Sequence, residues 1–205
     1  MSKRRVRWGK KIDFDLLMKL LFNVSTVDKD LPHNGRRKTP EHIVPMRFDY
    51  DCGLGAFSTW MLILDREDVL KTDLYSRLGV NEVDGTKSEK IKEVLNDEKI
   101  AYAEVTNAKI EDLEAVIGIG GSCLVSYQAW GEPAEIEKME CGHYSIVFDI
   151  DEEFVWLIDP SEDVEYTPGF GKGVVRRTRE EFEKLWVDKG ADGTIYDHWL
   201  LAARI

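Results

Sequence analysis

Three residues far apart in the chain have the chemistry of a single nucleophilic site: Cys52 in Asp-Cys-Gly, His143 in Gly-His-Tyr and Asp159 in Asp-Pro. A cysteine attacks as the thiolate, so a thiol hydrolase needs an imidazole beside the sulfur to hold that state. A third group must fix the tautomer of the imidazole. The three residue types predict a catalytic triad in which Cys52 is the nucleophile, His143 the base and Asp159 the orienting residue.

Cys52 is expected at the start of a helix. Leu54, Phe57, Met61 and Leu64 follow it at the spacing of a buried helical face. The free N–H groups and the positive dipole end of a helix stabilise a thiolate, and the same amides can bind an oxyanion. A cysteine at a helix start is more often a packing residue, but Asp51 and Gly53 on either side of Cys52, together with a matching His-Asp hairpin elsewhere in the chain, favour a reactive site.

His143 and Asp159 are expected on one β-hairpin. Alternating residues run from His143 to Ile150, and a second apolar run ends at Ile158, directly before Asp159. If Ile150 pairs with residue 153 or 154, Asp159 falls opposite residue 144 or 145 and diagonal to His143. The hairpin would then bring the base and the orienting residue together.

The other two cysteines favour a reducing environment over a disulfide framework. Cys123 lies in an apolar run and is expected in the core, and Cys141 lies two residues before His143. Three cysteines, an odd number without framework spacing, indicate free thiols and a cytoplasmic location. No Cys or His pattern has metal-ligand spacing, so the sequence predicts neither a metal nor a cofactor.

The motifs around the three residues also resemble a known family. Asp-Cys-Gly precedes a helix, Gly-His-Tyr-Ser-Ile-Val-Phe-Asp follows, and Val-Trp-Leu-Ile-Asp-Pro-Ser comes last. This order resembles the bacteriocin-processing (double-glycine) peptidase family and its stand-alone papain-like relatives. Further segments that look like those of the family, in its order, are 85–89, 124–130 and 179–186. The resemblance runs from Pro45 to the C-terminus and implies a papain-like peptidase that works through an acyl-enzyme.

One departure from the family concerns the oxyanion. The family usually carries a Gln about six residues before the nucleophile, but this chain has Met46 there. Removing one oxyanion donor costs about a hundred- to a thousandfold in rate, roughly 3 to 4 kcal/mol. Substitutes would be Arg47, the backbone amide of Cys52, or Gln128, the only Gln of the chain. Trp130, beside a Gly-Glu-Pro loop, is a candidate for lining a substrate cleft.

The pattern of elements predicts an α+β fold in which the Cys52 helix packs on a mostly antiparallel sheet. Thr86 with Glu89 and Thr178 with Glu181 are expected to form capping boxes at the starts of two helices. The other expected helices are about 13–22 and 110–116. The expected strands are about 101–105, 122–129, 144–150, 153–158 and 196–203.

Composition and charge divide the chain into two parts, a basic extension over residues 1–40 and a peptidase-like domain over 41–205. The first part carries 11 Lys and Arg against four Asp, while the whole chain has a net charge of −11. The acidic body argues against nucleic acid as a partner, no stretch is apolar enough to span a membrane, and the charges within 12–22 argue against a signal peptide. The basic arm could bind a protein or another anionic partner, lie on the acidic body of its own chain, or act as a propeptide over the cleft.

Two classes of function remain open from the sequence. The first is a thiol peptidase, with an acyl transferase that uses the same thiol as its close variant. The second is a non-catalytic papain-like module that binds peptides, which the absent Gln would favour. A peptide or protein substrate is common to both, and turnover through an acyl-enzyme on Cys52 distinguishes them.

Overall fold

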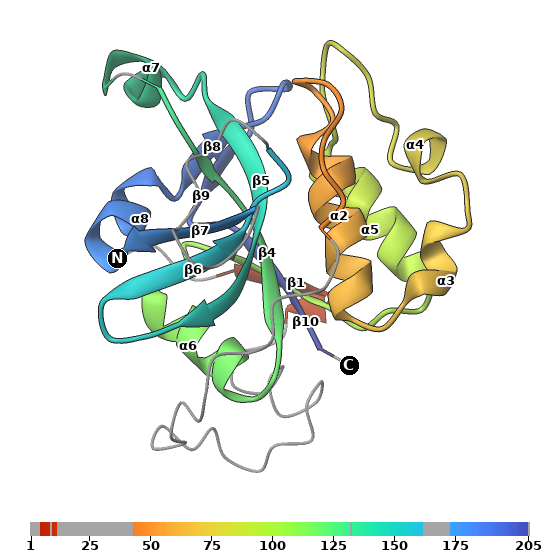
Figure 1. Cartoon of the computed structure of the whole chain (residues 1–205), viewed down its shortest axis with the longest axis horizontal. Coiled ribbons are helices and arrows are strands. Elements are labelled where there is room, and N and C mark those ends of the chain that lie inside the picture. Colours follow the sequence, from red (N-terminus) through yellow and green to blue (C-terminus); the bar gives the residue numbers. More distant parts are fainter. Residues whose placement is uncertain (1–4, 9, 12–42, 132, 162–172, 205) are drawn as a thin grey trace.

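The computed structural model describes residues 5–8, 10–11, 43–131, 133–161 and 173–204. Its centre is an eight-stranded sheet in the order β2-β1-β3-β10-β4-β5-β6-β7, with antiparallel pairing throughout (Figure 1). Its strands are β1 (Arg5–Trp8), β2 (Lys10–Lys11), β3 (Ala103–Thr106), β4 (Ser122–Gln128), β5 (Gly142–Ile150), β6 (Phe154–Ile158), β7 (Val174–Thr178) and β10 (Leu200–Ala203). A separate hairpin joins β8 (Val187–Lys189) to β9 (Ile195–Asp197).

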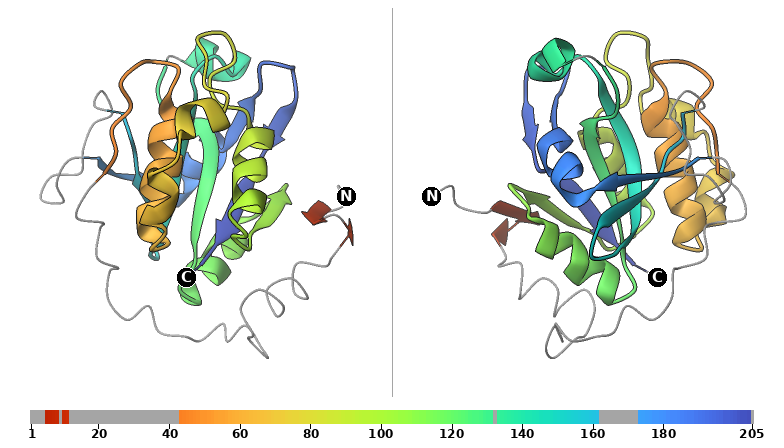
Figure 2. Two further views of the ribbon diagram at one scale, coloured as in Figure 1. Left: turned by 90° about the vertical axis from the view of Figure 1, so that its right-hand side faces the viewer. Right: turned by 60° about the vertical axis from the view of Figure 1, so that its left-hand side comes forward.

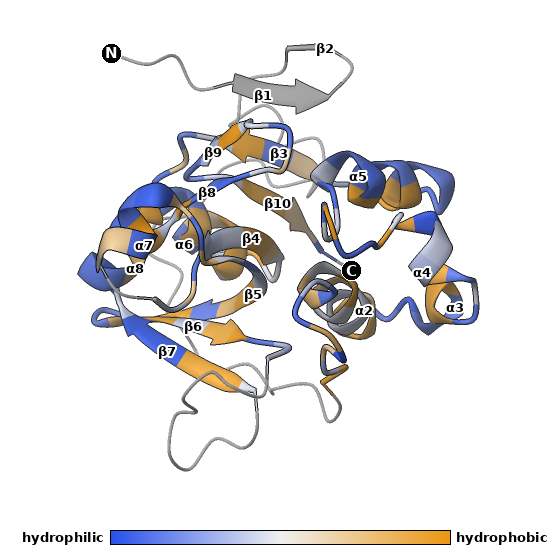
Figure 3. Ribbon diagram, turned by 90° about the horizontal axis from the view of Figure 1, so that it is seen from above, coloured by the Kyte–Doolittle hydropathy of each residue, from blue (hydrophilic) through white to orange (hydrophobic). Residues whose placement is uncertain are grey.

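Helices cover both faces of this sheet. On one side, α2 lies over β4 and β5 and α5 lies nearer to β3 and β10, with α3 and α4 beyond them, and on the other side lie α6 and α8 (Figures 1 and 2). The helices are α2 (Cys52–Ile63), α3 (Glu67–Leu70), α4 (Leu74–Arg77), α5 (Ser88–Asp97), α6 (Ile110–Gly118), α7 (Pro133–Lys138) and α8 (Arg179–Leu185). The charged sides of α5 and α8 face outward (Figure 3).

The two-sided cover explains the nearly continuous apolar runs of the central strands. Successive residues of a strand point to opposite faces, so Ile146 packs under α2 while Val147 packs under α6. Because both faces are buried, β4 and β5 can be apolar at every position that does not carry chemistry. The core therefore holds these two strands rigidly, and both of them contribute to the site described below.

Helix α2 is buried on nearly all sides. At Gly55 the absence of a side chain lets neighbouring segments approach the helix backbone closely. A Cβ at Gly55 would lie 2.8 Å from the Pro160 side chain and 3.0 Å from the Val44 carbonyl oxygen. The Met46 N–H also donates to the Pro160 carbonyl at 2.9 Å. The chain segment before Cys52 and the end of β6 are therefore packed directly against each other.

Several predicted elements are confirmed, and others need correction. The sheet, the Cys52 helix and the capping box of α8 are present, with Glu181 N–H donating to Thr178 Oγ1 at 3.2 Å. The capping box at Thr86 is wrong, because α5 begins at Ser88 with Lys87 as its N-cap. The expected strand 196–203 is broken into β9 and β10 at His198, whose φ is +47°. The sequence does not predict strands β1, β2, β7 and β8 or the short helices α3, α4 and α7.

The basic extension is described only in part. Residues 5–8 form β1, which pairs with β3 at Arg5–Thr106 and Val6–Val105. The helix expected over residues 13–22 lies outside the described residues, and the domain division at residue 40 stays a prediction. Among the described residues, no helix is long and apolar enough to cross a membrane.

Candidate active site

Cys52 is the first residue of α2, as predicted. The turn that precedes it is shaped by Asp51, whose buried side chain accepts the Arg47 N–H at 2.9 Å and the Phe48 N–H at 3.1 Å. Asp51 thus fixes the entry of the chain into the helix, and its side chain does not cap the helix. Because a first-turn N–H has no carbonyl partner within the helix, the Cys52 amide is available to a ligand.

The β5–β6 hairpin places Asp159 as the sequence predicts, but through a different register. Ile150 pairs with Val155, not with residue 153 or 154. A bulge at Phe148 then shifts the pairing by one residue, so that Ile146 pairs with Ile158. Continuing that register sets Asp159 opposite Ser145, one of the two expected positions.

The Asp159 carboxylate is buried and surrounded by donors. His143 Nε2 lies 2.8 Å from Oδ1, and the Ser161 N–H donates to the same oxygen at 2.8 Å. Ser145 Oγ donates to Oδ2 at 2.6 Å, and the Tyr127 hydroxyl donates to it at 3.2 Å. Burial raises the pKa of Asp159, but His143 and these hydrogen bonds outweigh burial and lower it overall. The carboxylate is therefore charged and held in one orientation.

His143 is buried between this carboxylate and Cys52. Burial disfavours the imidazolium, but Asp159 and Cys52, each also a hydrogen-bond partner, outweigh it and raise the pKa of His143 to about 10. Since Nε2 is engaged by Asp159, Nδ1 is the ring nitrogen left for the Cys52 sulfur. Hence the imidazolium is the stable form of His143 at neutral pH.

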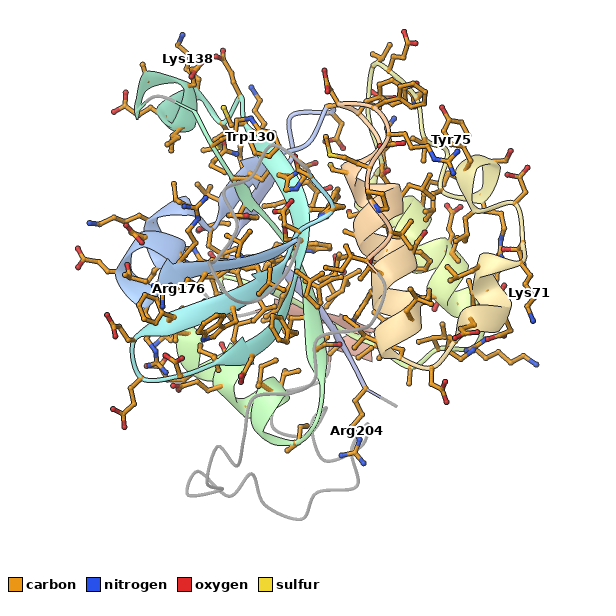
Figure 4. The ribbon with its side chains drawn as sticks, viewed as in Figure 1. Lys71, Tyr75, Trp130, Lys138, Arg176 and Arg204 are labelled. Atoms are coloured by element: carbon orange, nitrogen blue, oxygen red, sulfur yellow. The ribbon has the colours of Figure 1, made fainter. Side chains whose placement is uncertain are left out.

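Trp130 covers the imidazole. Its ring centroid lies 4.7 Å from that of His143, although 43% of the residue is exposed. It stands close to α7, near the upper end of β5 (Figure 4). Among the described residues, the lining of the cleft beside Cys52 does not include Trp130. The structure therefore places Trp130 against the imidazole of His143.

Cys52 and His143 both line an open cleft of about 320 Å³. One wall is the loop 82–87 before α5, and the other comes from the segment 139–144 and the β8–β9 turn around 188–192. In the described part of the chain, no three His, Cys, Asp or Glu side chains gather closely enough to hold a metal ion. The Cys52 thiol therefore lies in an open cleft between these two walls.

The two side chains expected to replace the missing Gln lie elsewhere. Arg47 lines a second cavity of about 330 Å³ with Leu54, Leu74 and Tyr75. Gln128 is fully buried, and its amide nitrogen donates to the Val187 carbonyl at 3.2 Å and to Asp188 Oδ1 at 3.1 Å. Neither belongs to the described lining of the Cys52 cleft. The backbone amide of Cys52 is the remaining candidate donor from the sequence.

Two residues of the cleft were missed by sequence reasoning. Asp188 is buried beside Gly142, where a Cβ would collide with its carboxylate, and it is held by Ser126, Gln128 and the Lys189 N–H. Burial raises its pKa despite these bonds. Gly142 has no side chain, which leaves room for the Asp188 carboxylate. In the sequence, this glycine is the one sign that another group lies against the segment before His143.

Thr86 is the second missed residue. Its side chain fills the space beside Gly53, with Oγ1 only 2.7 Å from where a Cβ on Gly53 would stand. The residue is 5% exposed and lines the cleft. Within the described part of the chain, Thr86 Oγ1 has no hydrogen-bond partner.

No protein-family model and no curated protein matches the chain. Solved structures do. A double-glycine motif protease from an AMS/PCAT transporter, in complex with the leader peptide, has a TM-score of 0.51 at 15% identity, covering 84% of this chain and 96% of that chain. The peptidase domain of Streptococcus ComA, a bifunctional ABC transporter of a quorum-sensing pathway, gives 0.51 at 16% identity, covering 80% and 100%.

A C39-like peptidase from Bacillus anthracis gives a TM-score of 0.53 at 12% identity, covering 80% of this chain and 94% of that chain. At such identities the likeness establishes the fold. The chain therefore has the α+β, papain-like fold of double-glycine peptidase domains, and the family resemblance of its motifs is confirmed at the level of architecture.

Proposed function

We propose that the chain is a cysteine peptidase in which Cys52, His143 and Asp159 form the triad. The observation that carries the proposal is the buried 2.8 Å contact between His143 Nε2 and Asp159 Oδ1. Cys52 is a second hydrogen-bond partner of the same imidazole. The shared fold with peptidase domains supports it. A peptide substrate is supported by the structural neighbour solved with a leader peptide. The cytoplasmic location stays a prediction from the cysteines.

The catalytic cycle follows from the charges of the pair. The Cys52 sulfur attacks the peptide carbonyl carbon, and the carbonyl electrons move to an oxyanion that faces the Cys52 N–H. His143 gives its proton to the leaving amine as the C–N bond breaks, which leaves a thioester on Cys52. His143 then takes a proton from water, the resulting hydroxide displaces the sulfur, and the acid leaves as the thiolate and imidazolium are restored. Asp159 keeps the same ring orientation through both halves.

A burst experiment tests the nucleophile without knowledge of the substrate. The probe is carbobenzoxyglycine p-nitrophenyl ester, whose activated carbonyl depends little on a strong oxyanion site. We expect stoichiometric release of p-nitrophenolate and an acyl mass increase on the Cys52 peptide in wild type. Cys52→Ala should abolish both, His143→Ala should slow them by about a hundredfold or more, and Cys141→Ser should keep them. Acylation at another residue would overturn the assignment of Cys52.

The binding module remains as a second candidate because the described lining of the cleft holds neither Arg47 nor Gln128. Incubation with a proteome-derived peptide mixture, read by mass spectrometry, separates the two. A peptidase generates new termini with repeated turnover, whereas a binding module gives none even when the ester acylates Cys52. Met46→Gln then tests the missing donor, and a rise in turnover of about one to three orders of magnitude is expected if that site is vacant.

A further inference from the structure

The cleft beside Cys52 is strongly acidic. Seven carboxylates line it, against two lysines and the His143 imidazolium: Asp49, Glu82, Asp84, Glu89, Glu140, Asp188 and Asp192 against Lys87, Lys189 and His143. Low-dielectric walls lined by charges of one sign concentrate the field inside a cleft. A ligand with positive charges would therefore be attracted to it.

The protein itself neutralises little of this charge. Lys87 pairs with Asp84 at 2.8 Å, and Glu89 is 3.6 Å from Lys92 outside the cleft. Within the described residues, Asp49, Glu82, Glu140, Asp188 and Asp192 have no Lys, Arg or His nitrogen within 4 Å, although Lys87 acts electrostatically on Asp192 and His143 on Asp188. Four of these five, all but Asp188, are exposed. The basic side chains that would balance them must come from a ligand or from residues outside the described part.

Thr86 gives an independent sign that a ligand binds at this place. A buried hydroxyl without a partner is rare in folded proteins, because it costs free energy that a hydrogen bond would recover. Thr86 lies against Gly53, next to the nucleophile, and lines the same cleft. A peptide that passes Cys52 can supply either a carbonyl acceptor or an N–H donor to a threonine hydroxyl.

The described part of the basic arm is not in this cleft. Residues 5–8 pair as β1 with β3, and β10 and β4 lie between β3 and β5 in the sheet. The cleft opens instead between α2 and β5, where Cys52 and His143 meet. The geometry is thus compatible with a ligand supplied by another molecule.

We propose that the substrate segment bound beside Cys52 is a cationic peptide, with Lys or Arg side chains that contact the acidic walls and a main-chain or side-chain group that hydrogen-bonds Thr86. The inference rests on the proposed function only in treating the bound segment as the substrate, and binding itself needs no turnover. Asp49 and Glu82 are specificity residues in this arrangement, and Thr86 is the hydrogen-bonding residue next to the nucleophile.

Binding to the full chain carrying Cys52→Ala tests the inference. The probe is a fluorescein-labelled peptide of about ten residues containing three lysines, and its two comparison peptides carry Nε-acetyllysine or glutamate at the same positions. We expect fluorescence anisotropy to show binding of the lysine peptide roughly tenfold tighter than that of the acetylated one. Raising the salt from about 0.05 M to about 0.5 M should remove most of this difference.

Matched variants locate the effect. Asp49→Asn and Glu82→Gln should each weaken binding of the lysine peptide by about two- to fivefold, whereas Glu111→Gln and Glu183→Gln, exposed on α6 and α8, should not. Thr86→Val should weaken binding of all three peptides. Thr86→Ser, which keeps the hydroxyl, should bind them as tightly as the chain with Thr86 does. Equal affinity for the three peptides, or equal effects of cleft and control variants, would overturn the inference.

Two outcomes distinguish the preference for a cationic substrate from the peptidase activity. Acylation of Cys52 without any preference for lysine would retain the peptidase and refute the cationic substrate. A lysine preference in the Cys52→Ala chain, without acylation of wild type, would retain the cationic ligand and refute the peptidase.

Discussion

At the scale of single residues, Asp159 is the best-supported group of the site. Four donors, His143, Ser145, Tyr127 and Ser161, fix its two oxygens. Such a carboxylate can hold an imidazolium in one orientation, and it acts on the thiol only through His143. Its substitution should therefore change the chemistry of Cys52 without removing the sulfur.

The thiol next to His143 should be the most reactive of the three cysteines. His143 lies beside the Cys52 sulfur and can take its proton, whereas Cys123 is fully buried and burial raises the pKa of Cys141. Iodoacetamide near pH 6, followed by peptide mass spectrometry, should modify Cys52 first. His143→Ala should slow that reaction, and earlier modification of Cys123 or Cys141 would refute the activation.

The Asp159→Asn variant should show how the imidazolium is maintained. Asp159 and Cys52 raise the pKa of His143 to about 10, so acylation that needs the imidazolium should fall as the pH rises through that value. Without the carboxylate, the alkaline limb of the pH–rate profile should move to lower pH, and the rate should drop by about a hundredfold or more. An unmoved limb would show that Asp159 does not control the charge of His143.

At the scale of elements, the sequence predicts what depends on local pattern. The helix start at Cys52 and the α8 capping box were readable because their residues are near neighbours in the chain. The hairpin register is not predictable in this way, because the bulge at Phe148 leaves no mark in the alternating pattern of the strand. The break between β9 and β10 occurs at His198, whose φ is positive. No glycine and no change in the apolar pattern marks this position in the sequence. Asp188 reaches the site through β8, which is too short to show a period.

Thr178 and Thr86 form a matched pair at this scale. Both precede a Glu three residues later, but only Thr178 caps a helix. Thr178→Ala should lower the free energy of unfolding by about 1 kcal/mol. Thr86→Val should leave it unchanged or raise it by up to about 1 kcal/mol, because an unpartnered buried hydroxyl is removed.

Urea unfolding of both variants measures the difference. Loss of stability in Thr86→Val equal to that in Thr178→Ala would mean that Thr86 is a structural hydrogen-bonding residue. That result would also remove the independent support for a ligand beside Gly53.

At the scale of the whole molecule, the buried pair makes folding depend on pH. The pKa of His143 is raised from 6.5, so its contribution to stability is complete below about pH 6.5 and is lost as the pH rises through about 10. The pKa of Asp159 is lowered from 3.8, so its contribution is present above that value and is lost as the pH falls through its folded pKa.

Asp159→Asn should therefore destabilise the fold most between about pH 4 and 6.5, by about 3 kcal/mol, and progressively less toward pH 10. Urea unfolding across this range is the measurement. Asp197→Asn is the control, because the Asp197–His198 pair at 2.6 Å is partly exposed and should contribute little. If the difference in unfolding free energy between wild type and Asp159→Asn stays constant from pH 4 to 10, the two residues do not form the ion pair.

The placement of the triad on two kinds of element has a consequence for how the chain folds. His143 and Asp159 are 16 residues apart on one hairpin, so loop closure between them is short and they can meet early. Cys52 comes from a helix that precedes the hairpin in the chain and reaches the imidazole only when α2 docks on the sheet. Before α2 docks, the sulfur has no imidazole beside it, so an unfolded or nascent chain lacks the activated nucleophile that could attack its own peptide bonds.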